Sequence, residues 1–157
     1  MTTKNGAQRT TGDNDIFDEL LAGHQRQRRL LELVGKTKGD SRGRRELFER
    51  LRSELDAHAE AEERALYSRM IAREAGRERA RHSLHEHEQI DDILEDLAAM
   101  DFSSTGWLNR FSTLRDKVEH HLEEEEEKVF PLATKLFSAE RARKMGERFE
   151  EIHAEAR

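Results

Sequence analysis

The feature that most constrains this chain is an apolar residue at every third or fourth position, sustained through four long segments. This spacing places the apolar side chains on one face of an α-helix. The four faces comprise Phe17, Leu20, Leu21, His24, Leu31 and Val34; Leu47, Phe48, Leu51, Leu55, His58, Glu62, Leu66 and Met70; Leu84, His87, Ile90, Leu94 and Leu97; and Trp107, Phe111, Leu114, Val118, His121, Glu125, Val129 and Leu132. We therefore predict an all-α fold of four long amphipathic helices. A shorter fifth helix should follow, with Met145, Phe149 and Ile152 on one face.

Short breaks separate the predicted helices. Residues 35–43 (GKTKGDSRG) and 101–105 (DFSST) are rich in turn-forming residues, and Gly76 marks a third break. Long helices joined by short loops favour an up-down-up-down antiparallel four-helix bundle. Pro131 should kink or end the fourth helix, because proline lacks the amide hydrogen that a helix interior uses.

These boundaries divide the chain into three parts. Residues 1–14 are polar and are expected to form a disordered N-terminal arm. Residues 15–137 should form the four-helix bundle. Residues 138–157 should form the additional short C-terminal helix, packed on the bundle through its apolar face.

Composition narrows the function classes. Charged residues make up 39% of the 157 positions and hydrophobic residues 34%, which suits amphipathic helices better than a β-sandwich. Cysteine is absent, which excludes disulfides, cysteine-based zinc sites, iron–sulfur clusters and covalently attached haem. The net charge of −6 disfavours nucleic acid, although Arg42, Arg44 and Arg45 cluster locally. No apolar run approaches the ~20 residues of a membrane span, and no signal peptide is recognisable. We expect a soluble cytoplasmic protein, monomeric or weakly homodimeric.

The first two helices resemble the next two at an offset of 63 residues. The same shift aligns apolar positions, such as Phe48 with Phe111 and Leu51 with Leu114. Within each pair of helices, the two histidines are separated by 34 residues. The polar positions that repeat are His24 with His87, His58 with His121, and Glu62 with Glu125.

The separation of the histidines has a geometric consequence. At ~1.5 Å per residue, the chain rises roughly 18 Å from His24 to the end of its helix. After the loop it descends roughly 22 Å to His58, so the two imidazoles should lie near the same height. Because His87 and His121 repeat this arrangement, we expect all four histidines to converge in one layer of the bundle.

Two carboxylates belong to the same layer. Glu62 and Glu125 each follow a repeated histidine by four residues, which places each pair on one helix face. A buried, unpaired carboxylate costs several kcal/mol, and a bound cation offsets that cost. Six protein ligands exceed the needs of one ion. They match two octahedral ions, each held by two histidines and bridged by the carboxylates, with oxo, hydroxo or water ligands completing them. Imidazole and carboxylate suit iron, manganese or zinc.

Four segments resemble the hemerythrin-like HHE cation-binding domain family. They are LLAGH at 20–24, HAEAEERALY at 58–67, HEHEQI at 85–90 and HLEEEEEKVFP at 121–131. The resemblance implies a four-helix bundle around a non-haem di-iron centre. Family members include oxygen carriers, sensors of oxygen, iron or redox state, proteins that handle nitric oxide, and proteins that consume peroxide. Carried over position by position, the implied metal ligands are His24, His58, Glu62, His87, His121 and Glu125.

The chain departs from the oxygen carriers of that family. Those proteins have a further histidine four residues before the ligand in the third helix, where this chain has Ser83. In addition, Glu125 follows His121 by four residues, as in bacterial members, rather than by five. A set of four histidines and two glutamates leaves more open coordination positions. This favours redox chemistry with peroxide, dioxygen or nitric oxide over reversible oxygen transport.

Three functions therefore compete. The preferred hypothesis is a protein with two non-haem iron ions that cycle between ferrous and ferric states. Its reaction would be catalase-like disproportionation of peroxide, with no catalytic residues besides the metal ligands. The alternative is a non-catalytic module that binds or senses oxygen, iron or nitric oxide. The third is a helical scaffold without metal.

Further polar side chains near the predicted ligands have less certain roles. We interpret Tyr67 as a packed aromatic matching Phe130, with a ligand or redox role left open. His82 and His85 are expected to lie behind the ligands or at the surface, and His120 should point away from the His121 face. His153 should be exposed. Glu63 and Glu126 are assigned to solvated faces, with a role behind the ligands or in a surface salt bridge as the alternative.

Overall fold

The structure, a computed structural model, describes residues 14–156, and the expected N-terminal arm lies outside this range except for Asn14. Every regular element of the described range is helical, as predicted. The elements are α1 (Ile16–Gly35), α2 (Arg42–Glu62), η2 (Glu63–Tyr67), α3 (Ser68–Ile71), α4 (Glu74–Ala99), α5 (Thr105–Glu124), η3 (Glu125–Val129), α6 (Phe130–Leu136) and α7 (Ala139–Ala156).

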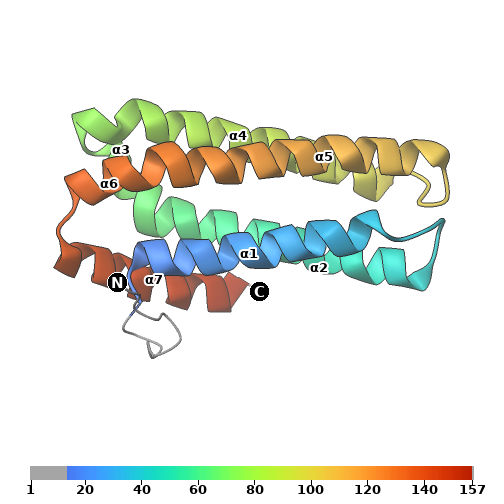
Figure 1. Cartoon of the computed structure of the whole chain (residues 1–157), viewed down its shortest axis with the longest axis horizontal. Coiled ribbons are helices and arrows are strands. Elements are labelled where there is room, and N and C mark those ends of the chain that lie inside the picture. Colours follow the sequence, from blue (N-terminus) through green and yellow to red (C-terminus); the bar gives the residue numbers. More distant parts are fainter. Residues whose placement is uncertain (1–13, 157) are drawn as a thin grey trace.

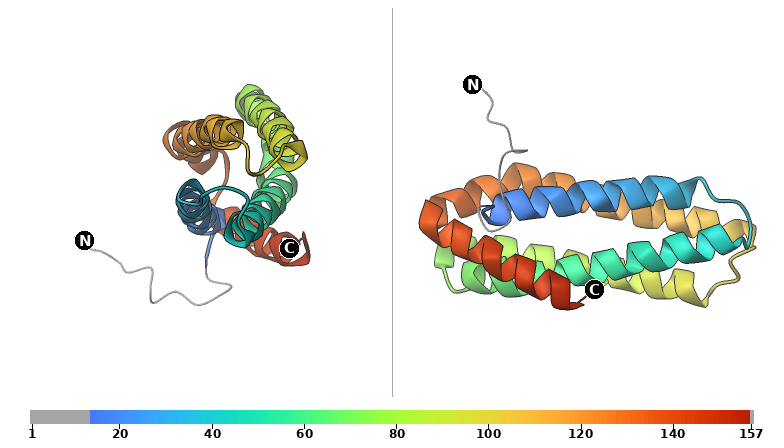
Figure 2. Two further views of the ribbon diagram at one scale, coloured as in Figure 1. Left: turned by 90° about the vertical axis from the view of Figure 1, so that its right-hand side faces the viewer. Right: turned by 90° about the horizontal axis from the view of Figure 1, so that it is seen from below.

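Four helical rods run antiparallel to their neighbours along the chain, which confirms the predicted bundle (Figure 1). The second rod consists of α2, η2 and α3, and the fourth consists of α5, η3 and α6. The elements η2 and η3 are single π-helical turns within otherwise α-helical rods. Seen end on, the rods surround a common interior, and α7 lies outside them along α1 and α2 (Figure 2).

Local sequence explains where the helices begin. The Asp15 carboxylate accepts a hydrogen bond from the Asp18 amide at 2.9 Å, and the Asp18 carboxylate accepts one from the Asp15 amide at 3.1 Å. This reciprocal capping box satisfies two amides that have no partner within the helix. Ser41 caps α2 in the same way, by accepting from the Arg44 amide at 3.0 Å.

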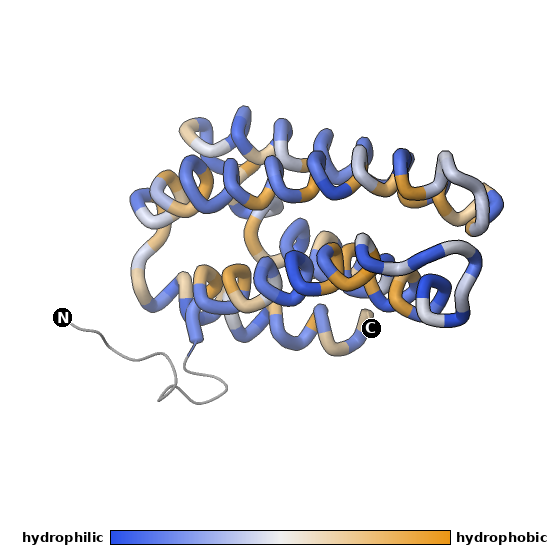
Figure 3. The backbone as a smooth tube through the Cα atoms, turned by 45° about the vertical axis from the view of Figure 1, so that its right-hand side comes forward, coloured by the Kyte–Doolittle hydropathy of each residue, from blue (hydrophilic) through white to orange (hydrophobic). Residues whose placement is uncertain are grey.

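Apolar and polar residues alternate along each rod (Figure 3). The buried apolar residues form two clusters rather than one continuous core. One includes Leu51, Trp107 and Leu114, and the other includes Tyr67 and Met145. The four repeated histidines lie along their helices between the residues of these two clusters. A polar layer therefore divides the apolar core of the bundle.

The C-terminal helix α7 packs on the bundle as expected. Met145, Phe149 and Ile152 are buried against α1 and α2. The expectation that His153 is exposed is wrong, because its side chain is 6% exposed and its Nε2 donates to Glu54 Oε2 at 3.1 Å. This contact fastens the end of α7 to the middle of α2.

Two expected interruptions take a different form. The break before the third rod falls at residues 72–73, and Gly76 lies inside α4, where a β-carbon would approach Leu136 Cδ1 to 2.9 Å. This glycine allows close packing instead of ending a helix. Pro131 does not end the fourth rod, which continues to Leu136. The π turn η3 directly precedes Pro131, and such turns change the hydrogen-bonding register of a helix.

No helix in the described range is long and apolar enough to cross a membrane.

Arg44 is a structural residue rather than part of a basic surface. Its side chain is 1% exposed, and its guanidinium lies 4.7 Å from the centre of the Trp107 ring. It donates to the carbonyl of Thr37 at 3.0 Å and to the carbonyl of Phe102. These carbonyls belong to the α1–α2 and α4–α5 connections, so one side chain ties together both loops at that end of the bundle.

We predict that Arg44→Ala lowers the free energy of unfolding by about 3 kcal/mol, because it leaves buried carbonyl groups without donors. The matched control is Arg42→Ala, which removes a 91% exposed side chain that pairs with Glu46 on the surface. The control should change stability by less than about 0.5 kcal/mol. Urea unfolding of both variants measures the difference, and equal effects would contradict the role given to Arg44.

Candidate metal centre

The structure brings the six predicted residues into one buried cluster. Each rod contributes one histidine, and the second and fourth rods each add a glutamate one helical turn later. All six side chains are at most 9% exposed. These six residues form two overlapping groups, in each of which one nitrogen or oxygen atom per residue lies within 4.8 Å of the others. One group contains His24 and His58, the other contains His87 and His121, and both contain Glu62 and Glu125.

The π turns η2 and η3 occupy equivalent places in the two halves of the bundle. Glu62 is the last residue before η2, and Glu125 is the first residue of η3. Isolated π turns inside α-helices occur frequently at functional sites, because they redirect side chains that a regular helix would place elsewhere. The next residues along the chain, Glu63 and Glu126, reach histidines of the opposite half.

Three outer carboxylates orient the histidines. Nδ1 of His24 donates to Glu126 at 2.7 Å, and Nδ1 of His87 donates to Glu63 at 2.7 Å. Arg28 holds Glu126 through two hydrogen bonds of 3.0 and 3.2 Å. The expectation that Glu63 and Glu126 belong to solvated faces is therefore wrong. They are only 39% and 26% exposed, and both act on the buried cluster.

The third outer carboxylate was not predicted. Nδ1 of His121 donates to Glu86 Oε1 at 2.7 Å, and Glu86 is 4% exposed. The internal repeat could not identify this residue, because its counterpart in the first half is Gly23. The sequence does contain one indication of Glu86, because this residue directly precedes the predicted ligand His87 in the chain.

With Nδ1 occupied by an outer carboxylate, Nε2 of each of these imidazoles is directed into the cluster. Nε2 of His24 lies 2.9 Å from Glu125 Oε1, and Nε2 of His121 lies 3.4 Å from Glu125 Oε2. Nε2 of His87 lies 3.2 Å from Nε2 of His121 and 3.4 Å from Glu62 Oε1. When Nδ1 carries the proton, Nε2 has a lone pair, and these contacts place that lone pair close to a carboxylate oxygen or to the lone pair of another Nε2. A cation among them removes the repulsion.

His58 and Glu62 contain polar atoms without partners. Both ring nitrogens of His58 and both carboxylate oxygens of Glu62 are buried, and they form no hydrogen bond with any residue that the structure describes. An unsatisfied buried polar group costs roughly 1–3 kcal/mol, and more when it is charged. Nδ1 of His58 lies against Gly23, whereas Nε2 of His58 faces the Glu62 carboxylate, and both residues are of types that bind metals. The side chains present therefore fit a cation.

Burial and mutual repulsion perturb the ionisable groups of the metal-free cluster. Burial, followed by the charge of Glu125, raises the pKa of Glu62 well above its ordinary value. Burial, followed by repulsion from His24, lowers the pKa of His58 well below its ordinary value. Burial opposes the charge on His121, but Glu125 and Glu86 outweigh it and raise its pKa to about 9. Clustered perturbations of this kind are typical of functional sites.

Tyr67 is both a packed aromatic and a hydrogen-bond donor to the cluster. Its buried hydroxyl donates to Glu125 Oε2. Burial, followed by the charges of Glu125 and Glu62, raises the pKa of the Tyr67 hydroxyl well above its ordinary value, while a hydrogen bond from Ser83 acts in the opposite direction. The hydroxyl therefore keeps its proton. Ser83, the residue four positions before His87, therefore lies next to Tyr67.

The two halves of the cluster are not equivalent. Phe130, the counterpart of Tyr67, stacks on the His24 ring with centres 5.8 Å apart. Gly23, the counterpart of Glu86, lies against the His58 ring, and Phe149 of α7 makes an edge contact with that ring at 5.3 Å. The half with His58 is therefore enclosed by apolar contacts. The half with His121 has an additional carboxylate.

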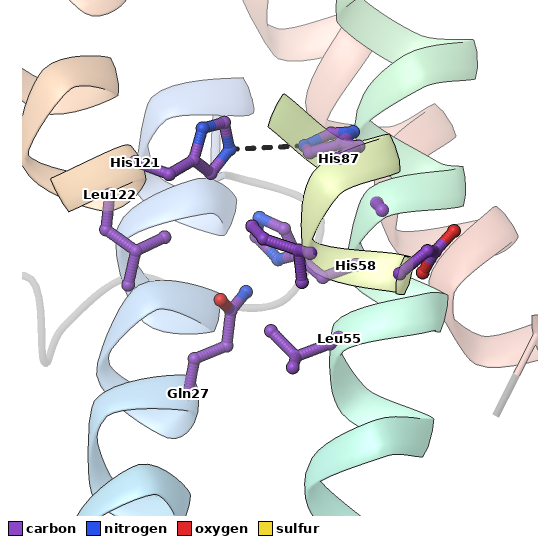
Figure 4. Close-up of a pocket in the computed structure, with 9 residues that line it drawn as sticks. Gln27, Leu55, His58, His87, His121 and Leu122 are labelled. Carbon is purple, nitrogen blue, oxygen red and sulfur yellow. Dashed lines mark hydrogen bonds between the residues drawn. The ribbon is translucent and has the colours of Figure 1, made fainter. Parts of the chain in front are cut away.

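A small cavity adjoins the cluster. Its volume is about 20 Å³, and its lining includes His58, His87 and His121 together with the apolar side chains of Leu55 and Leu122. Figure 4 shows the three imidazoles on one side of this space and Gln27, Leu55 and Leu122 on the other. A cavity of this size holds one water molecule or a similarly small ligand.

Besides the buried His153, three exposed histidines lie outside the cluster. His85 is 65% exposed and lies nearest Glu88, and His120 is 68% exposed. His82 is 46% exposed and lies beside Glu124 and Glu86. None of the three belongs to the two groups around Glu62 and Glu125.

The family model described as the Hemerythrin HHE cation binding domain matches residues 15–133. A crystal structure of a Hemerythrin HHE cation binding domain-containing protein from Mycobacterium kansasii is similar, with a TM-score of 0.83 and 22% sequence identity. The similarity covers 91% of this chain and 87% of that one. At this identity the likeness establishes a shared fold. Among curated proteins, no significant match was found.

The contact between Gly23 and His58 gives a prediction. A β-carbon at Gly23 would lie 2.4 Å from His58 Nδ1, so Gly23→Ala must displace the imidazole. We expect the free energy of unfolding to fall by about 1–3 kcal/mol despite the better helix propensity of alanine.

The matched control is Gly43→Ala in α2, where the nearest atom would lie 3.9 Å away. This substitution should leave stability unchanged or raise it by up to about 1 kcal/mol. Thermal unfolding of both variants provides the comparison. A stable Gly23→Ala protein would mean that His58 is free to move.

Proposed function

The chain belongs to the hemerythrin HHE cation-binding family, and from this premise we propose that it is a metalloprotein with two non-haem iron ions. One ion would be held by His24 and His58 and the other by His87 and His121. Glu62 and Glu125 would be shared by both. The substrate would be peroxide, dioxygen or nitric oxide.

The observation that carries this proposal is the convergence of four imidazoles on two buried carboxylates, with His58 and Glu62 left without hydrogen-bond partners. Two overlapping donor sets suit two ions better than one. Nitrogen and oxygen donors of these types bind iron, manganese and zinc, so the donor set supports a transition metal rather than calcium or magnesium.

Iron would supply one-electron chemistry between its ferrous and ferric states, which neither imidazole nor carboxylate can provide. The side chains of this chain have three further roles. Glu63, Glu86 and Glu126 fix the direction in which His87, His121 and His24 present Nε2. Tyr67 holds a proton on its hydroxyl oxygen next to Glu125. The cavity beside His58 and His121 admits only a very small ligand.

Peroxide disproportionation is the reaction we favour, with non-catalytic binding or sensing of dioxygen, iron or nitric oxide as the second candidate. The set of two histidines per ion leaves room for an exogenous ligand, which favours reactivity. The apolar wall formed by Leu55 and Leu122, and the small size of the cavity, favour an uncharged diatomic or peroxide ligand over a larger substrate.

The role of Glu62 is tested by stability measured with and without metal. In metal-free protein at neutral pH, Glu62→Gln should raise the free energy of unfolding by about 1–3 kcal/mol, because it removes the cost of protonating and burying the Glu62 carboxyl next to Glu125. The same variant should lose the stabilisation that added ferrous iron gives the unsubstituted chain, which would reach about 4 kcal/mol at a thousandfold excess over the dissociation constant.

The matched control is Glu60→Gln, two residues earlier on α2. Glu60 is 52% exposed and pairs with Arg64 on the surface. This variant should respond to iron as the unsubstituted chain does. Glu62→Gln protein that keeps both its iron content and its iron-dependent stabilisation would contradict the proposed ligand role.

Reactivity is tested on protein reconstituted with iron under anaerobic conditions. Addition of peroxide should release dioxygen, measured with an oxygen electrode, while stopped-flow absorption follows the iron charge-transfer bands. Absence of dioxygen release with an intact iron spectrum would rule out the catalase-like reaction. A long-lived spectrum with dioxygen or nitric oxide under the same conditions would favour the binding and sensing alternative.

A further inference from the structure

A second group of metal-binding side chains lies outside the buried cluster. It consists of His82 and Glu86 on α4 and Glu124 at the end of α5. Nε2 of His82 lies 3.3 Å from Glu86 Oε2 and 3.2 Å from Glu124 Oε1. We propose that these three side chains form an outer site for a divalent transition-metal ion, separate from the buried centre.

The distances fit a metal ion as well as they fit an ion pair. Zinc binds nitrogen and oxygen ligands at ~2.0–2.1 Å, so neighbouring ligand atoms of a tetrahedral site lie about 3.3 Å apart. The contacts from His82 to the two carboxylates have this length. His82 and Glu86 are four residues apart on one helix face, and Glu124 reaches them from the adjacent rod. Three ligands from two rigid helices make the site pre-formed.

Neighbouring groups act on the outer site in opposite directions. Glu86 and Glu124 supply two carboxylates, while Arg79 donates to Oε2 of Glu124 at 3.0 Å and Lys128 Nζ lies 4.0 Å from the same oxygen, so that Oε1 of Glu124 is the atom that faces His82. Nε2 of His120 lies 3.8 Å from Glu124 Oε1, and its 68% exposed side chain can turn to provide a second nitrogen. His82 and Glu124 line a surface hollow of about 420 Å³, through which a hydrated ion can approach.

Glu86 connects this outer site to the buried cluster. One of its oxygens faces His82, and the other accepts the Nδ1 hydrogen bond of His121 at 2.7 Å. A cation in the outer site is therefore separated from a histidine of the buried cluster by a single carboxylate. The outer site itself requires no metal in the buried centre.

The experiment counts bound zinc ions on the full-length protein by equilibrium dialysis followed by elemental analysis. Comparison with His82→Ala isolates the outer site, because this half-exposed residue is absent from the buried cluster. We expect the variant to bind one zinc ion fewer per chain. A second variant, Glu124→Gln, should lose the same ion. Circular dichroism verifies that both variants are folded.

The matched control is His85→Ala. His85 is on the same helix three residues further along, and it is 65% exposed, with Glu88 as its ionic neighbour at 3.8 Å. The control should bind as many zinc ions as the unsubstituted chain. Equal zinc content in the unsubstituted chain and in His82→Ala would overturn the proposal, since it would leave protonated His82 as the partner of the two carboxylates. Equal losses from His82→Ala and His85→Ala would also overturn it, by indicating non-specific surface binding.

The two proposals fail independently. Glu62→Gln should lose buried ions and keep the zinc ion that depends on His82. A chain that binds only this one ion supports the outer site and contradicts the buried di-metal centre. If all the zinc ions depend on Glu62 and none depends on His82, the result supports the buried di-metal centre and contradicts the outer site.

Discussion

The close approach of imidazole nitrogens and carboxylate oxygens in one buried layer is the constraint on which this structure depends. Nε2 atoms of His87 and His121 lie 3.2 Å apart, and neither carboxylate oxygen of Glu62 accepts a hydrogen bond from any residue in the range 14–156. Without a positive charge among them, such groups repel one another or lose hydration without compensation. The layer also divides the apolar core into two clusters, so the bundle has less continuous packing where the polar groups lie. The polar layer stabilises the bundle less than apolar side chains at the same positions would, which is common at functional sites.

The internal repeat explains the symmetry of the cluster, and its departures explain the differences between the halves. Where the second half has Glu86 behind His121, the first half has Gly23 behind His58. Where the first half has Tyr67, which donates to Glu125, the second half has Phe130, which stacks on His24. An outer carboxylate increases the basicity of an imidazole ligand, and an apolar contact does not. The two proposed ions would therefore have different surroundings despite equivalent ligand types.

Much of the fold follows from the sequence because it depends on long periodic patterns. Apolar stripes that continue over several helical turns average out local exceptions, and the repeat at an offset of 63 residues places four histidines at one level. Short-range features were harder to predict. Gly76 lies inside a helix because of tertiary packing against Leu136, and His153 is buried because Glu54 of another helix receives its hydrogen bond. The carboxylates behind the histidines were also misjudged. Glu63 and Glu126 belong to highly charged stretches, and only the π turns and the opposite helices distinguish them from solvent-exposed neighbours.

The most direct test of the central claim is anomalous X-ray diffraction from iron-loaded crystals, recorded on both sides of the iron absorption edge. The account predicts two iron peaks per chain, one beside His24 and His58 and one beside His87 and His121, with Glu62 and Glu125 between them. A single peak, or none within the layer of histidines in protein that retains iron, would contradict it.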